Sequence, residues 1–212
     1  MSKRGRYLKK LEKVYLFVVF LLEISLIISA ISSYLGKNYL SLFISLIVFV
    51  TVLIPYFFRW KYSLKIPLEI EAVSVIFIYA TLFLGEAQSF YDVFWWWDIL
   101  LHGFSALVFG FVGFIVLYFL YSHHRIDVNP YWLGVFTFSF AVAIGVIWEI
   151  FEFSMDTLFG LNMQKSGLVD TMGDLIVDSI GALIASFLGF IYLHHKKSFF
   201  IKKFFNYLLR KD

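Results

Sequence analysis

The chain has 212 residues, of which 61% are hydrophobic and only 16% are charged, with a mean hydropathy of +0.83. A soluble domain usually carries about 25% charged residues, so this composition excludes a cytosolic enzyme, a nucleic-acid-binding module and a disordered protein. The absence of cysteine excludes disulfides, thiol catalysis and zinc sites built on sulfur. We therefore predict an integral membrane protein that contacts membrane lipids and has no nucleic-acid partner.

Six apolar segments are each long enough to cross a bilayer, whose hydrocarbon core of about 30 Å takes roughly 20 helical residues. They cover residues 14–33, 39–58, 68–88, 99–121, 131–154 and 172–193. The segments that connect them are short, and all three prolines fall at or near span ends. The pattern predicts an all-α polytopic membrane protein, a bundle of six transmembrane helices. This domain, residues 14–193, lies between a basic tail, 1–13, and a basic amphipathic tail, 194–212.

Basic residues are divided unevenly between the two sides of this bundle. Sixteen of the 18 Lys and Arg residues fall in the two tails and in the loops at 59–67 and 122–130. Only Lys37 and Lys165 fall on the other side. Because cytoplasmic segments are enriched in Lys and Arg, both termini are predicted to be cytoplasmic.

Acidic residues gather on the opposite, extracytoplasmic side. Nine of the 15 Asp and Glu residues lie at the outer ends of the last four spans or in the loops that join them. These nine are Glu86, Asp92, Asp98, Glu149, Glu152, Asp156, Asp170, Asp174 and Asp178. Since successive spans run in opposite directions, we expect these ends to meet on one face of the membrane.

Helical spacing groups most of these acids into stripes, because residues three or four apart share a helix face. Three stripes result: Asp98 with His102, Glu149 with Glu152 and Asp156, and Asp170 with Asp174 and Asp178. If the three stripes face inward, they form a polar well lined by carboxylates and one imidazole.

A charged side chain at the bilayer centre costs on the order of 2.5–3.5 kcal/mol, so such a well requires an explanation. With two basic residues on that side, the carboxylates must share protons, bind cations or line a water-filled cavity. All three outcomes indicate a functional site. The alternative is a hydrogen-bonded polar network that only fixes the register of the helices.

Oxygen ligands with one imidazole suit divalent ions such as Mg²⁺, Mn²⁺ or Fe²⁺. The other four histidines fall at cytoplasmic span ends, which leaves His102 as the candidate imidazole. The predicted metal ligands are Asp98, His102, Glu149, Glu152, Asp156, Asp174 and Asp178. A metal in this site would polarise an ester or phosphoryl oxygen, and Glu86 or Asp170 is the predicted general base.

Two stretches of the chain carry a family resemblance. GEAQSFYDVFWWWDILLHGFSALVFGFVGF (85–114) and IGVIWEIFEFSMDTLFGLNMQKSGLVDTMGDLIVDSIGALIAS (144–186) resemble the YjdF-like family of prokaryotic membrane proteins. The resemblance covers roughly residues 66–190 and implies a prokaryotic plasma membrane. That family is in turn similar to the VanZ-like group, whose pattern has Lys after the first Asp and Asn near the last helix. Ile99 and Asp178 stand at those two positions here.

Three functions are compatible with these features. The first is a metal-dependent membrane hydrolase or transferase acting on a lipid or lipid-linked substrate at the outer leaflet. The second is a cation or proton transporter, because carboxylates at membrane depth serve such pathways. Glu23 in the first span is a polar residue that could continue a pathway towards the inner side. Glu69 and Glu71 lie at the cytoplasmic edge of the third span and could form half of such a pathway. The third is a non-catalytic membrane scaffold.

Overall fold

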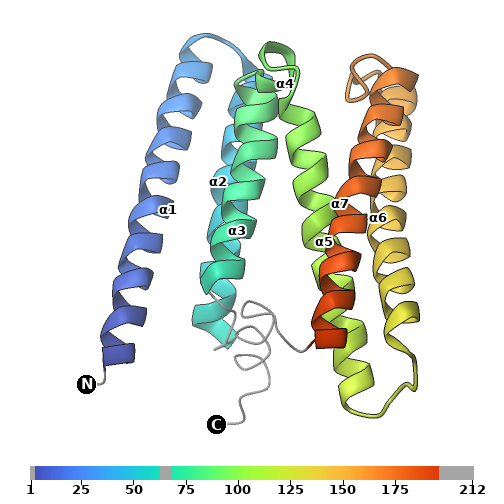
Figure 1. Cartoon of the computed structure of the whole chain (residues 1–212). Helices are drawn as coiled ribbons and strands as arrows, with labels where there is room; N and C mark the ends of the chain where they lie inside the picture. The colour runs from blue at the N-terminus through green and yellow to red at the C-terminus, as the bar shows by residue number, and fades with distance from the viewer. Residues whose placement is uncertain (1–2, 63–67, 196–212) are drawn as a thin grey trace. The chain divides into compact units, whose positions relative to one another are not determined.

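The computed structural model describes residues 3–62 and 68–195, and within these ranges it contains helices and no strand. The helices are α1 (Lys3–Leu35), α2 (Tyr39–Tyr62), α3 (Leu68–Ile78), the π-helical η1 (Tyr79–Ala87), α4 (Phe90–Val93), α5 (Trp97–Ser122), α6 (Pro130–Phe159) and α7 (Leu168–His195) (Figure 1). Six helical segments in the described ranges are long and apolar enough to cross a membrane. The predicted all-α fold with six such helices is therefore confirmed.

The observed helices extend beyond several predicted span ends. α6 continues to Phe159 and α7 begins at Leu168, so Asp156 and Asp170 both lie within helices rather than in the connecting loop. The third span is built from α3 followed by η1, which changes the helix from α to π at Tyr79. Hydropathy measures length and polarity alone, so it cannot detect this change in hydrogen-bonding pattern.

The chain divides into two compact units, residues 1–97 and residues 98–212. The core of the first unit contains Leu26 from α1, Val48 and Val52 from α2, Val75 from α3 and Phe83 from η1. The predicted division into a domain at 14–193 and two tails stays a prediction. Most of the basic C-terminal tail, residues 196–212, lies outside the described residues.

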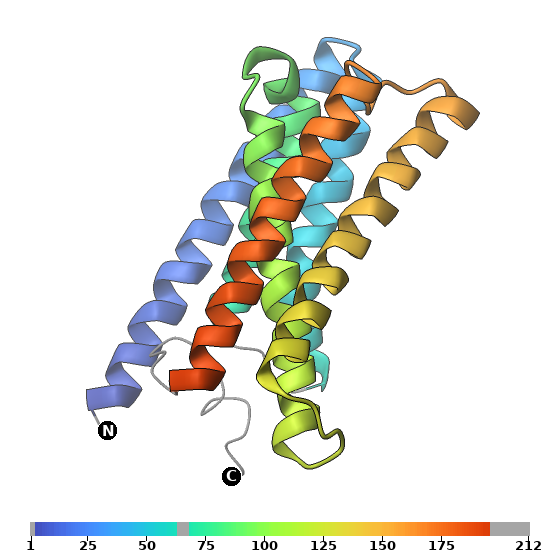
Figure 2. The same ribbon diagram turned by 45° about the vertical axis from the view of Figure 1, so that its right-hand side comes forward.

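The second unit contains α5, α6 and α7, and α6 lies beside α7 (Figures 1 and 2). Small residues allow these helices to approach closely, as is common between membrane helices. A Cβ atom added at Gly181 of α7 would lie 2.7 Å from the carbonyl oxygen of Gly103 on α5. At the other end of the unit, Phe114 of α5 packs edge-on against Tyr192 of α7, with 6.2 Å between ring centroids.

The start and the end of α6 carry the expected capping residues. Asn129 accepts a hydrogen bond from the backbone N–H of Trp132 at 3.1 Å, and Pro130 occupies the first turn. Gly160 ends the helix in the left-handed conformation with φ of 67°. These signals fix where α6 begins and ends.

Candidate metal centre

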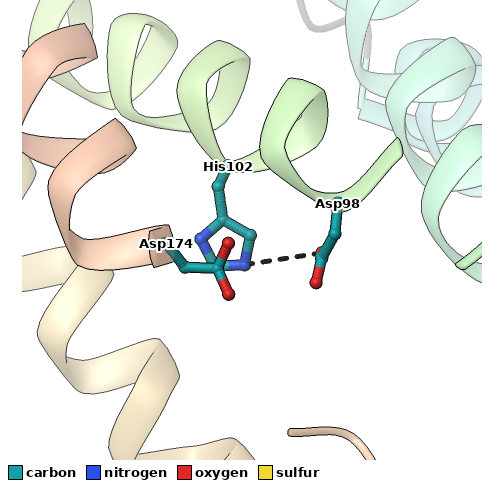
Figure 3. A group of neighbouring side chains, drawn as sticks. All are labelled: Asp98, His102 and Asp174. Carbon is teal, nitrogen blue, oxygen red and sulfur yellow. Dashed lines mark ion pairs between the residues drawn. The ribbon is translucent and has the colours of Figure 1, made fainter. Parts of the chain in front are cut away.

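The centre is built around His102, which α5 places one helical turn after Asp98. Its Nε2 atom lies 3.8 Å from Oδ1 of Asp98, and Asp174 reaches the same imidazole from α7 (Figure 3). One ligand atom from each of these three residues lies within 4.8 Å of the others. Two helices of the second unit therefore supply a group that could hold a metal ion.

A second group shares the same imidazole and draws its acids from α6. The Nε2 atom of His102 lies 4.0 Å from Oε1 of Glu149, and Glu152 lies one turn further along the helix. Ligand atoms of these three residues also lie within 4.8 Å of one another. All three helices of the second unit therefore contribute to one cluster.

Most of the cluster is buried, although the side chain of Asp98 is 26% exposed. The exposed fraction is 7% for His102, 4% for Glu149, 3% for Asp174 and 1% for Asp178. Both carboxylate oxygens of Glu149, Oδ2 of Asp174 and Oδ1 of Asp178 are buried and accept no hydrogen bond from the described residues. Buried polar atoms normally have partners, so these four oxygens around one imidazole require a cation, a proton or a water molecule as a partner.

Like charges make this arrangement costly in the absence of a counter-ion. Within the described part of the chain, the ion pairs of Asp98, Glu149 and Asp178 all go to His102, which carries at most one positive charge. One imidazolium cannot neutralise five neighbouring carboxylates. The remaining negative charge must be offset by bound cations, removed by shared protons or solvated by water.

The structure thus brings six of the predicted residues into one cluster: Asp98, His102, Glu149, Glu152, Asp174 and Asp178. Asp156 lies on the same stripe of α6 but is engaged elsewhere. Its Oδ1 accepts the backbone N–H of Met163 at 2.7 Å and its Oδ2 that of Gln164 at 2.9 Å. Asp156 therefore stabilises the loop between α6 and α7 through these two hydrogen bonds. Its role as a metal ligand stays a prediction.

The two predicted general bases have different positions. Asp170 lies in the first turn of α7, one turn before Asp174, and is partly exposed. Glu86 lies in η1 of the first unit. Both catalytic assignments stay predictions.

Two residues near the cluster were not predicted from the sequence. A Cβ atom at Gly145 of α6 would collide with Oδ2 of Asp178, so only glycine allows this carboxylate its position. Trp148 donates from Nε1 to Oε1 of Glu152 at 3.0 Å. The spacing of the sequence did indicate that Gly145 is near the cluster, because Gly145 lies four residues before Glu149 and so shares its helix face.

A protein-family model described as "Predicted membrane protein (DUF2238)" matches residues 14–195. This match supports the YjdF-like resemblance and extends it from residues 66–190 into the first two spans, whereas the similarity to the VanZ-like group stays a prediction. An uncharacterised protein of Thermotoga maritima is 29% identical over 134 residues, which cover 60% of this chain and 65% of the relative, less than two thirds of its length. No solved structure matches the chain. The chain belongs to the DUF2238 family of membrane proteins.

Proposed function

We propose that this membrane protein binds a divalent cation between α5, α6 and α7 and uses it on a lipid or lipid-linked substrate at the extracytoplasmic leaflet. The observation that carries the proposal is the set of four buried carboxylate oxygens without hydrogen-bond partners around His102. A cation supplies the partner that the oxygens of Glu149 and Asp174 lack. It also offsets the repulsion between neighbouring acids.

The donor set suits Mg²⁺, Mn²⁺ or Fe²⁺, since it combines several carboxylate oxygens with one imidazole. A bound cation of this kind supplies Lewis-acid polarisation of an ester or phosphoryl oxygen. The described outer side of the second unit offers one basic residue, Lys165, so the cation is also the natural partner for a phosphate group. In this proposal Asp170, which lies one turn nearer the helix end than Asp174, accepts a proton as general base.

Elemental analysis and thermal unfolding of the purified chain test the cation. A ligand that binds only the folded state stabilises it, so we expect a chelator to lower the melting temperature and Mn²⁺ or Mg²⁺ to restore it. The variants His102→Asn and Glu149→Ala should lose this response while the protein still inserts into the membrane. Asp127→Asn, an exposed acid far along the chain from the cluster, is the matched control and should respond like the unmodified chain.

A melting curve that is indifferent to chelator and metal, with no metal in the purified protein, would contradict the proposal. If the carboxylate variants then lost stability alone, the non-catalytic scaffold would be the better account. Hydrolysis or group transfer on outer-leaflet lipids of defined composition, dependent on added metal and lost in His102→Asn, tests the enzymatic part separately.

A specific observation in the first unit favours the second candidate, proton or cation transport. Glu23 lies midway along the apolar segment Leu11–Leu35 of α1 and is 9% exposed. Both of its carboxylate oxygens are buried and accept no hydrogen bond from the described residues. Nearer the start of α1, Tyr15 donates to Oε1 of the buried Glu71 at 3.0 Å. Ionisable groups at this depth commonly mark proton or ion paths.

Transport is tested with the full chain in liposomes that contain a pH-sensitive dye. A potential imposed across the membrane should drive proton uptake, and Glu23→Gln should abolish it because the amide cannot carry the proton. Ser74→Ala, at an exposed position of α3, is the control. Proton uptake at the rate of empty liposomes would remove proton transport from the candidates.

A further inference from the structure

The two ring nitrogens of His102 face different acids. Nδ1 lies 3.4 Å from Oδ2 of Asp178 on α7. Nε2 lies 3.8 Å from Oδ1 of Asp98 and 4.0 Å from Oε1 of Glu149. A neutral imidazole carries a proton on one nitrogen and a lone pair on the other, so these contacts decide which nitrogen can bind a cation.

Asp178 is the most deeply buried acid of the cluster. It is 1% exposed, and its position depends on Gly145, where a Cβ atom would collide with Oδ2. Gly145 lies one turn before Glu149 on α6. The packing of α6 against α7 therefore places this carboxylate oxygen against the Nδ1 side of the imidazole.

We infer that Asp178 is a positioning residue, which accepts a hydrogen bond from Nδ1–H of His102 and so directs Nε2 to the cation; this inference rests on the proposed function. The lone pair of Nε2 then points to the side of the ring where Asp98 and Glu149 lie. Carboxylates that hold a metal-binding histidine in this way fix its tautomer and its orientation. This assignment replaces the prediction that Asp178 is itself a ligand.

Nuclear magnetic resonance of the full chain in detergent identifies the binding nitrogen. The chain is labelled with ¹⁵N-histidine and loaded with ¹¹³Cd²⁺, whose coupling to nitrogen is visible only through a direct bond. We expect coupling at Nε2 of one histidine, a signal that is lost in His102→Asn. Coupling at Nδ1 would overturn the inference even though the proposed metal site would stand.

Two substitutions at Asp178 separate positioning from ligation. Asp178→Ala removes the acceptor for Nδ1–H, and we expect the affinity for Cd²⁺ to fall about 10–100-fold, as is typical for loss of such a partner. Asp178→Asn keeps a carbonyl acceptor, so it should retain most of the affinity and the Nε2 coupling. If Asp178 were a ligand, the amide would cost as much as the alanine, and that result would overturn the inference.

Two further variants complete the test. Gly145→Ala should reproduce the effect of Asp178→Ala, because its methyl group displaces the Oδ2 atom. Ser179→Ala, next to Asp178, removes a hydroxyl that bonds only to the carbonyl of Leu175 and should leave affinity and coupling unchanged. If the unmodified chain bound no Cd²⁺, the proposed function would fail and this inference with it.

Discussion

Glu149 makes the sharpest prediction at the scale of single residues, because both of its oxygens are buried without partners. Without metal, an ionised carboxylate in this position costs free energy, so Glu149→Gln should stabilise the metal-free chain. We expect a gain of about 1 kcal/mol, or roughly 2–4 °C in melting temperature for a chain of this size. With metal present the same variant should be less stable than the unmodified chain.

This reversal distinguishes a binding site from a structural network, and melting curves in chelator and in excess Mn²⁺ measure it. Ser154→Ala is a suitable control, because that exposed hydroxyl on α6 bonds only to the carbonyl of Ile150. A Glu149→Gln variant that is destabilised equally in both conditions would show that the carboxylate serves packing rather than a cation.

Sequence periodicity predicted the residues of the cluster but not the role of each one. The spacing of Glu149, Glu152 and Asp156 indicated one stripe, and the first two do face His102. Asp156 differs because it lies in the last turn of α6, where the chain reverses and backbone N–H groups of the following loop require acceptors. The importance of Gly145 could not be predicted, because it depends on which residue of another helix lies opposite.

At the scale of helices, the contact between α5 and α7 depends on the absence of a side chain at Gly181. A Cβ atom there would lie 2.7 Å from the carbonyl oxygen of Gly103 and 3.2 Å from the backbone nitrogen of Leu107. Backbone atoms cannot move aside as a flexible side chain can, so Gly181→Ala should push the helices apart. We expect a loss of about 1–3 kcal/mol in stability and weaker metal binding, because Asp174 and His102 lie on these two helices.

Gly173, on the same helix, provides the matched control. A Cβ atom at Gly173 meets no atom within 4 Å, so Gly173→Ala should be neutral or stabilising by up to about 1 kcal/mol through its higher helix propensity. Thermal unfolding and Mn²⁺ titration of both variants measure the difference. Equal behaviour of the two variants would show that close approach of α5 and α7 is unnecessary for the cluster.

At the scale of the whole molecule, hydropathy predicted the six spanning helices because a bilayer imposes one length and one polarity on each of them. Helix ends were less well predicted, because polar residues near these ends lower the hydropathy without interrupting the helix. α6 continues to Phe159 and α7 begins at Leu168. The distribution of basic residues predicts the direction of insertion, which the length and polarity of the spans do not determine.

The orientation of the whole chain is the remaining prediction, and the absence of cysteine makes it directly testable. Sixteen of the 18 basic residues lie on the side assigned to the cytoplasm, so the loop that contains Asp127 should be cytoplasmic and the loop that contains Ser166 extracytoplasmic. Both positions are exposed and both can carry a single new cysteine. A membrane-impermeant maleimide added to intact cells should label Ser166→Cys, whereas Asp127→Cys should react only after lysis. The reverse pattern would place the cluster around His102 on the cytoplasmic side, and a substrate in the outer leaflet would then be excluded.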